Sequence, residues 1–354
     1  MAKENATPEI VNTNGTNDFF VDKAPTMDSF VFMDKTAKVL EIGFETEKNI
    51  VLYGPGGHGK SEMTMAFFAE KGIDPYVITM GTGMTTDRMF GGLDIPTFNN
   101  TGKIEYLVEN SFMNHEFVIF EEMFDAPDFI LEQLKDILSS GTFRNGTQSF
   151  PIKTKFIVCC TNRTRDEFSK NMSLKALMER FPLELNVIWD NYTDISYNKL
   201  LEERFGEGNV DPVIPFVLQE YAKNSIVISP RVAITAYSVY EKCGAEALGY
   251  IAEFAKKPKL VADGLKKFEA QAKLRSLGTI MQDHYVELNT NPLSNTEELE
   301  MFNETYTQYT DMLKELKGLK VSDDLITTHN KIYKEHEGRH KDLGKKLMIA
   351  TTMI

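Results

Sequence analysis

The chain has 354 residues, of which 42% are hydrophobic and 26% charged, an ordinary composition for a soluble globular protein with two or three domains. Its formal net charge of −13 disfavours nucleic acid as a partner, because phosphates repel an acidic surface unless a local basic patch intervenes. No apolar run approaches the roughly 18 residues that span a bilayer, so we expect no membrane segment.

The first residues and the cysteines favour a reducing compartment. Residues 1–25 are polar and lack the apolar core of an export signal, so we expect a flexible tail and no signal peptide. Cys159 and Cys160 are adjacent in an apolar run, Cys243 stands alone, and the sequence contains no CxxC pair. We therefore expect free thiols and a cytoplasmic location.

Residues 26–190 alternate between helical and strand-like patterns. The expected elements are helices at 33–49, 59–72 and 128–141, strands at 49–54, 75–80, 117–120 and 155–162, a Gly-rich polar stretch at 81–103 and a β-hairpin at 142–152. Asn145-Gly146 is a strong turn signal between the arms of that hairpin. Alternating strands and helices predict a large α/β domain with a parallel sheet covered on both faces.

From residue 191 the pattern is helical, and we expect a helical lid at 191–255 and a helical extension at 256–354. A Ser-Pro pair opens a helix at 228–244. The lysine-rich stretch at 256–275 is interrupted by acidic residues, and we interpret it as a solvated helix face.

Residues 299–316 have the three-and-four spacing of a heptad pattern, carried by Leu299, Phe302, Tyr306, Tyr309, Leu313 and Leu316. The pattern lasts few heptads. It therefore favours a helical hairpin, or a helix docked on its own domain, over a coiled coil.

The segment GPGGHGKS fits the phosphate-loop pattern G-x-x-x-x-G-K-[ST], and it follows a strand and opens a helix. Glycines let the backbone approach phosphate oxygens, and the amides at a helix N-terminus attract the anion. Lys60 would reach the β- and γ-phosphates, and Ser61 would bind magnesium. The predicted nucleotide-binding residues of this loop are Gly54, Pro55, Gly56, Gly57, His58, Gly59, Lys60 and Ser61.

The apolar run FVIF at 117–120 ends in two glutamates. Magnesium prefers oxygen ligands and keeps several waters, so we predict that Glu121 serves the metal directly or through water. Glu122 would then orient or deprotonate the attacking water. The alternative is that Glu121 weakens the metal site and that the chain only binds nucleotide.

Over roughly residues 30–250 these motifs resemble the AAA+ superfamily, and within it the MoxR-like branch. The segments that carry the resemblance are GPGGHGKS (54–61), GTGMTTDRMFGG (81–92), GKIEYLVENSF (102–112), FVIFEEMFDAP (117–127), GTFRNGTQSF (141–150), CCTNR (159–163), LKALMERFPLEL (174–185) and SPR (229–231). They look like the phosphate loop, the insert in the second helix, the acidic strand, the hairpin before the sensor strand, both sensors and the arginine finger. The chain departs from the family at Glu121, where members have Asp, and at Asp125, where they usually have a basic residue.

The resemblance implies roles for three further residues. Asn162 would sense the γ-phosphate, Arg180 would reach the site of a neighbouring subunit, and Arg231 would be the second sensor in the lid. Each has a simpler interpretation, since Asn162 could cap a turn, Arg180 could end a solvated helix and Arg231 could be a surface residue.

The resemblance further implies ATP and Mg²⁺ as cofactors, an AAA+ P-loop core with a helical lid and a C-terminal helical extension, and a ring, most simply a hexamer. It implies ATP hydrolysis coupled to remodelling of a protein partner, often a von Willebrand factor A-domain protein. The alternatives from other classes are a nucleic-acid-acting motor and a nucleotide-gated scaffold with little turnover.

The segment HEGRH at 336–340 matches the zinc-protease pattern H-E-x-x-H. A third ligand is needed, and Asp342 is the one candidate after His340. Gly338 weakens the helix, and the charged neighbours suggest an exposed face. We therefore interpret the match as a coincidence.

Overall fold

The computed structural model describes residues 25–146, 148–169, 172–188, 194–290, 296–318 and 323–352. The predicted tail, apart from its last residue, lies outside the described residues. The chain divides into two compact units, one formed by Met1–Gly54 with Gly59–Val187 and the other by Pro55–His58 with Ile188–Ile354. None of the described helices is long and apolar enough to cross a membrane.

The first unit is built on a five-stranded sheet in the order β2-β5-β8-β1-β9, with every neighbouring pair parallel. The strands are β1 (Ile50–Tyr53), β2 (Tyr76–Thr79), β5 (Phe117–Glu121), β8 (Phe156–Thr161) and β9 (Leu183–Asn186). The predicted α/β fold with a parallel sheet is confirmed. The edge strand β9 is a finding of the structure, since its segment LELN carries no strong strand pattern.

The central strands are buried on both faces, which explains their unbroken apolar runs. In β8, Ile157 and Cys159 lie in one hydrophobic cluster, whereas Phe156, Val158 and Cys160 lie in the other. Helices α1 (Asp34–Thr46) and α2 (Lys60–Glu70) cover the second of these faces through residues such as Leu40, Phe67 and Phe68. Helices α5 (Asp128–Ser140) and α7 (Met172–Met178) cover the first.

The expected Gly-rich stretch at 81–103 contains two short helices, α3 (Thr86–Phe90) and α4 (Ile95–Thr101), and the strand β3 (Gly92–Leu93). Thr85 and Asp94 cap these helices through their side chains, and β3 pairs with β4 (Tyr106–Leu107). Gly91 has a positive φ of 97°, and a Cβ there would lie 2.2 Å from the carbonyl oxygen of Leu107. Only glycine fits this turn.

The predicted hairpin is present as β6 (Thr142–Asn145) and β7 (Gln148–Pro151), paired antiparallel. The remaining short elements of the first unit are η1 (Met27–Ser29), η2 (Phe112–Asn114), η3 (Met123–Asp125) and α6 (Arg165–Ser169). Of these, η3 matters most for the site, because it follows directly on the two glutamates.

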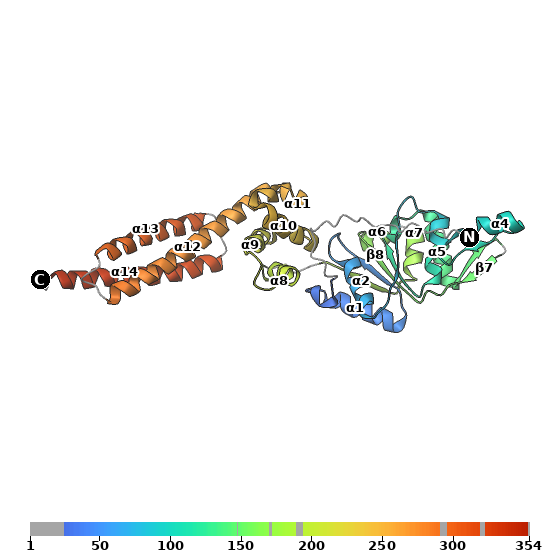
Figure 1. Ribbon diagram of the computed structural model, residues 1–354, viewed down its shortest axis with the longest axis horizontal. Helices are drawn as coiled ribbons and strands as arrows, with labels where there is room; N and C mark the ends of the chain where they lie inside the picture. Colours follow the sequence, from blue (N-terminus) through green and yellow to red (C-terminus); the bar gives the residue numbers. More distant parts are fainter. Residues whose placement is uncertain are drawn as a thin grey trace, which may run out of the picture. The chain divides into compact units, whose positions relative to one another are not determined.

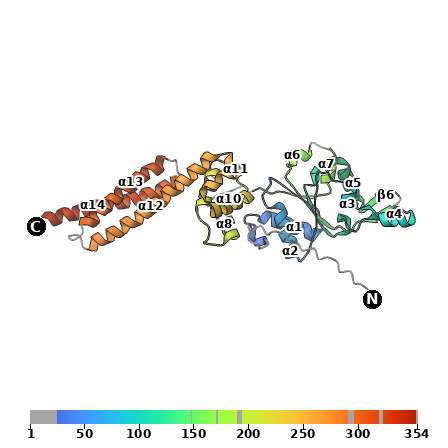
Figure 2. The same ribbon diagram turned by 45° about the horizontal axis from the view of Figure 1, so that its top comes forward.

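The second unit is helical. Its elements are α8 (Asp194–Phe205), α9 (Val213–Lys223), α10 (Pro230–Cys243), η4 (Ala245–Tyr250), α11 (Ala252–Ala255), α12 (Pro258–Thr290), α13 (Thr296–Gly318) and α14 (Asp323–Thr352). Figures 1 and 2 both show α12, α13 and α14 side by side. Phe302, Tyr309 and Leu313 are buried in the cluster that these helices share, so the heptad-spaced residues dock α13 on its own chain. The side chains of Leu299 and Leu316 lie outside the described part.

The interpretation of 256–275 as a wholly solvated face is wrong for Lys267. This residue is buried on α12, and its ammonium group forms an ion pair with the buried Glu220 of α9. Lys223 contacts the same carboxylate at 2.9 Å. The pairing explains how a lysine can face the interior, because a buried charge is tolerated when it is paired.

The HEGRH residues lie on α14 and contribute to the packing of the bundle. His336 is buried and packs edge-on against Tyr309, while His340 stacks on Tyr306 with 5.0 Å between the ring centroids. The described part of the chain contains no group of three or more His, Cys, Asp or Glu residues placed to hold a metal ion.

Candidate functional site

The predicted phosphate loop connects β1, an inner strand of the sheet, to the N-terminus of α2. Gly54, Gly57 and Gly59 have φ values of 137°, 78° and 78°, which favour glycine. A Cβ on Gly54 would lie 2.5 Å from the carbonyl oxygen of Val187, so this residue also allows a close backbone approach. His58 folds back on the loop, with its Nδ1 atom 3.1 Å from the carbonyl oxygen of Gly56.

Lys60 is the first residue of α2, and its ammonium group is held from two sides. It donates to the carbonyl oxygen of Gly54 at 2.8 Å and to Oδ1 of Asn162 at 3.0 Å. The residue is buried. A buried cation between a glycine-rich loop and a polar strand end is placed to meet an anion.

The last residue of β5 is Glu121, which lies beside Thr79 of β2 and Cys160 of β8 in the sheet register. The hydroxyl group of Thr79 donates to Oε2 of Glu121 at 2.7 Å. Thr79 was not among the site residues predicted from the sequence. The available signal was its position at the end of a predicted strand, where side chains of adjacent parallel strands meet.

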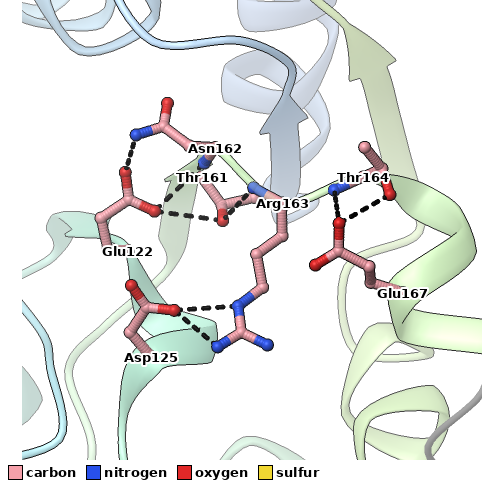
Figure 3. Close-up of polar contacts among 7 residues, drawn as sticks. All are labelled: Glu122, Asp125, Thr161, Asn162, Arg163, Thr164 and Glu167. Atoms are coloured by element: carbon pink, nitrogen blue, oxygen red, sulfur yellow. Dashed lines mark hydrogen bonds and ion pairs between the residues drawn. The ribbon is translucent and has the colours of Figure 1, made fainter.

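Glu122 follows in the left-handed region with φ 50°, which is uncommon for a non-glycine residue. Its carboxylate accepts three hydrogen bonds, from the amide of Asn162 at 3.1 Å, from Nδ2 of Asn162 at 2.5 Å and from the hydroxyl group of Thr161 at 3.3 Å (Figure 3). Its own amide donates to the carbonyl oxygen of Cys160 at 2.8 Å. Asn162 therefore connects the carboxylate of Glu122 to the ammonium of Lys60.

An ion pair that the sequence analysis did not foresee lies next to this cluster. Nε and Nη2 of Arg163 contact Oδ1 of Asp125 at 2.8 and 2.7 Å (Figure 3). On the other side of Arg163, Thr164 and Glu167 are joined by a 2.9 Å hydrogen bond at the start of α6.

Ser61 is the second residue of α2, and its hydroxyl group is hydrogen-bonded to the thiol of Cys160. Burial raises the pKa of the Cys160 thiol to about 11, although hydrogen bonds from Thr64 and Ser61 oppose the shift. Cys160 is therefore a neutral thiol near pH 7. The hydroxyl of Ser61 and the carboxylate of Glu121 would each offer an oxygen ligand, which is the kind that Mg²⁺ prefers. Phosphate and water would supply the remaining magnesium ligands, so such a site needs no larger group of acidic residues.

The remaining predicted site residues are Arg180 of the first unit and Arg231 of the second. Arg180 follows α7, and its Nε donates to the hydroxyl group of Ser139 on α5 at 2.8 Å. Its Nη1 lies 3.5 Å from the carboxylate of Glu179. Arg231 is the second residue of α10 in the second unit, which includes Pro55–His58, and its backbone amide donates to the carbonyl oxygen of Gly57 at 3.3 Å.

A parallel sheet with a glycine-rich loop between one of its inner strands and a helix, and with acidic and polar residues at the ends of the adjacent strands, is the arrangement of the P-loop NTPase class. Residues 21–209 match the family model described as the MoxR domain in the MoxR-vWA-beta-propeller ternary systems. The match spans more than half of the chain, and the chain belongs to this family of MoxR-like AAA+ ATPases.

Solved structures with a related fold include NtrX from Brucella abortus in complex with ATP, which is 14% identical. That similarity covers 82% of this chain and 68% of NtrX with a TM-score of 0.43. The RuvB Holliday junction branch migration motor from Thermotoga maritima is also 14% identical, covering 72% of this chain and 78% of RuvB with a TM-score of 0.43.

Proposed function

We propose that the chain binds ATP with Mg²⁺ and hydrolyses the γ-phosphate bond. The observation that carries the proposal is the position of Asn162, which contacts Lys60 on one side and Glu122 on the other. The ammonium group of Lys60, at the start of α2, and the carboxylate of Glu122, after β5, are thereby held by the same side chain. This is the arrangement that phosphoryl transfer to water needs, because the chemistry depends on positioning and charge stabilisation.

Each site residue has a defined role in the proposed reaction. The amides of residues 54–61 and the ammonium of Lys60 bind the phosphates. Ser61 and Glu121 would hold magnesium, which supplies positive charge to the phosphate oxygens. Glu122 orients the attacking water and accepts its proton, and Asn162 contacts the γ-phosphate and fixes the carboxylate of Glu122.

Assembly is the second part of the proposal. Arg180 makes its contacts with Ser139 and Glu179 inside its own subunit, rather than with the cluster around Lys60. We propose that it completes the site of a neighbouring subunit in a ring, most simply a hexamer, where its charge stabilises the transition state. Arg231 is proposed to contact the bound nucleotide from the lid.

Release of phosphate from the purified protein tests the enzymatic part. We expect magnesium-dependent turnover in the wild type and none in Lys60→Ala, because the variant lacks the charge facing the β- and γ-phosphates. Lys71→Ala is a matched control, since Lys71 directly follows the C-terminal end of the same helix, whereas Lys60 begins it. The ammonium group of Lys71 forms an ion pair with the carboxylate of Glu41 at 2.9 Å. Wild-type turnover no faster than that of Lys60→Ala, across protein concentrations that favour assembly, would contradict the proposal.

The work of the ATPase is proposed to be the remodelling of a protein partner. The description of the family names von Willebrand factor A and β-propeller components, which supports a partner of the A-domain class. The net charge of −13 disfavours a nucleic-acid motor. A nucleotide-gated scaffold with little turnover remains the second candidate, favoured by the longer Glu121 at the metal position and its hydrogen bond to Thr79.

Co-purification with an ATP-trapped assembly separates these functions. The assembly would be made with the Glu122→Gln variant. The partner tested would be the von Willebrand factor A-domain protein whose gene lies nearest to the gene of this chain. ATP-dependent retention of that protein, released on hydrolysis by the wild type, supports remodelling. Salt-sensitive retention of DNA that stimulates the ATPase would overturn it, and a stable wild-type assembly with almost no turnover would favour the scaffold.

A further inference from the structure

The ion pair between Asp125 and Arg163 joins the two segments that carry the proposed base and sensor. Asp125 ends η3, three residues after Glu122, and Arg163 directly follows Asn162. Strands β5 and β8 are neighbours, and the last ladder position pairs Glu121 with Cys160. Directly after that position, the backbone amide of Glu122 donates to the carbonyl oxygen of Cys160 at 2.8 Å. The ion pair then joins the segments that follow the two strands.

Glu122 needs such a constraint. A non-glycine residue with φ 50° is in a sparsely populated conformation, which persists when its surroundings hold it. The hydrogen bonds from Asn162 and Thr161 hold the carboxylate, but both donors are on the segment that leads to Arg163. A shift of that segment would therefore move the donors away from Glu122.

Arg163 is connected to Glu122 by a second route. Its backbone amide donates to the hydroxyl group of Thr161 at 3.2 Å, and that hydroxyl group donates to Glu122 at 3.3 Å. Figure 3 shows both routes, one through the side chain of Arg163 to Asp125 and one through its backbone to Thr161. The position of Arg163 thus controls the geometry around the carboxylate from two directions.

The ion pair between Asp125 and Arg163 is expected to contribute little to the stability of the fold. The side chains of Arg163 and Asp125 are 39% and 41% exposed, and ion pairs of such exposure contribute little to the free energy of unfolding. Two guanidinium nitrogens on one carboxylate oxygen nevertheless fix direction, which a single contact from a lysine does not. We therefore expect loss of the ion pair to alter the geometry of the site more than the stability of the fold.

We propose that Asp125 and Arg163 are a positioning pair, which sets the distance and orientation of Glu122 relative to Asn162 for hydrolysis. The inference rests on the proposed ATPase function and assigns to that site two residues that touch neither phosphate nor metal. It predicts that breaking the pair slows the chemical step while leaving nucleotide binding by the loop intact.

The test compares kcat, KM for ATP and nucleotide affinity in single and reversed variants. Asp125→Ala and Arg163→Ala should each lower kcat by roughly tenfold or more, because small misplacement of a catalytic group is costly. Nucleotide affinity should stay at the wild-type value. Arg163→Lys, which keeps the charge but loses the two-nitrogen contact, should fall between the wild type and Arg163→Ala.

The reversed pair, Asp125→Arg with Arg163→Asp, should recover a substantial part of the kcat that either alanine variant loses. Arg165→Ala is the matched control, because this exposed arginine lies two residues further on and pairs with Glu184 at 2.7 Å. It should retain wild-type kcat. Thermal unfolding of every variant identifies any general loss of structure.

Three results would overturn the inference. The first is wild-type kcat in both alanine variants. The second is a loss of nucleotide affinity that accounts for the slower turnover. The third is a folded reversed pair, together with a folded Arg163→Lys, both as slow as Arg163→Ala. A wild-type protein that turns over no faster than Lys60→Ala is a different outcome, since it contradicts the proposed function itself.

Discussion

The side-chain amide of Asn162 donates to Oε1 of Glu122 over 2.5 Å. Its oxygen accepts from Lys60, and because a lysine can only donate and a carboxylate can only accept, the two neighbours fix which way the amide points. The side chain of Asn162 therefore bridges Lys60 and Glu122 in one orientation. Its chemical asymmetry can be tested directly.

Asn162→Asp should be more damaging to hydrolysis than its small change in size suggests. The new carboxylate can still accept from Lys60, but it cannot donate to Glu122 and places a second negative charge beside it. We expect a loss of kcat on the order of a hundredfold, and a smaller loss in Asn162→Ala, which removes the contact without adding repulsion. Phosphate release measures both, and equal rates in the two variants would contradict the proposed bridging role.

The two glutamates should respond differently to substitution. Glu122→Gln should bind ATP but hardly hydrolyse it, because the proton acceptor is gone while the loop and Glu121 remain. Glu121→Asp should stay active, since the shorter acid is still an oxygen ligand for magnesium. Nucleotide retention after gel filtration and phosphate release distinguish them. If Glu121→Gln trapped ATP and Glu122→Gln turned over normally, the two roles would have to be exchanged.

Arg180 should act between subunits. Arg180→Ala is expected to bind ATP but lose most of its activity, because the site of the neighbour lacks a stabilising charge. Mixing it with Lys60→Ala should restore part of the turnover, since each variant supplies what the other lacks. Ser139→Ala is the matched control: it removes the hydrogen bond within the subunit but keeps the arginine, so it should retain activity. No rescue in mixed assemblies verified by mass would argue against a shared site.

The buried Glu220 should make the helical unit sensitive to acid. Burial alone raises the pKa of this carboxyl, but Lys267 and Lys223 outweigh burial and hold its pKa below the ordinary 4.5. A lowered pKa means that the stabilisation is present above about pH 4.5 and is lost as the pH falls through the lower folded value. Urea unfolding followed between pH 7 and pH 3 measures this loss.

Glu220→Gln should remove most of that pH dependence and lower the free energy of unfolding by about 3 kcal/mol at pH 7, because Lys267 is left buried with a neutral partner. Glu253→Gln is the control, since the pair of Glu253 with Lys256 is exposed and should contribute below about 1 kcal/mol. Similar losses in the two variants would argue against the importance of burial.

The sheet was predictable wherever a strand is buried on both faces, because β1, β5 and β8 are short unbroken apolar runs. β9 was not, since its residues are only partly buried and leave a weak pattern. Helices α3 and α4 were missed because they are five and seven residues long and depend on the caps of Thr85 and Asp94 within a glycine-rich stretch. Short helices held by caps have too few residues to show a period.

The phosphate loop and the pair of glutamates were recognised because the residues of each motif are contiguous in sequence, at 54–61 and 121–122. The pairs Asp125 with Arg163 and Glu220 with Lys267 were not, because their partners are 38 and 47 residues apart. A charge that looks solvated in the sequence becomes a positioned or buried group once folding supplies its partner. The roles of all the site residues, Arg180 and Arg231 among them, remain predictions.

The three thiols of the chain are unequal, since Cys159 and Cys160 are buried in β8 and Cys243 is exposed. Burial raises the pKa of Cys159 well above its ordinary value and that of Cys160 to about 11, so neither presents a reactive thiolate. A thiol reagent should therefore modify Cys243 at once and the other two only when the central strand is exposed. The rate of the slow phase of modification would measure the opening of the α/β core without any engineered cysteine. Because Cys160 lies 3.9 Å from the hydroxyl of Thr64 on the helix after the phosphate loop, bound nucleotide should lengthen that time.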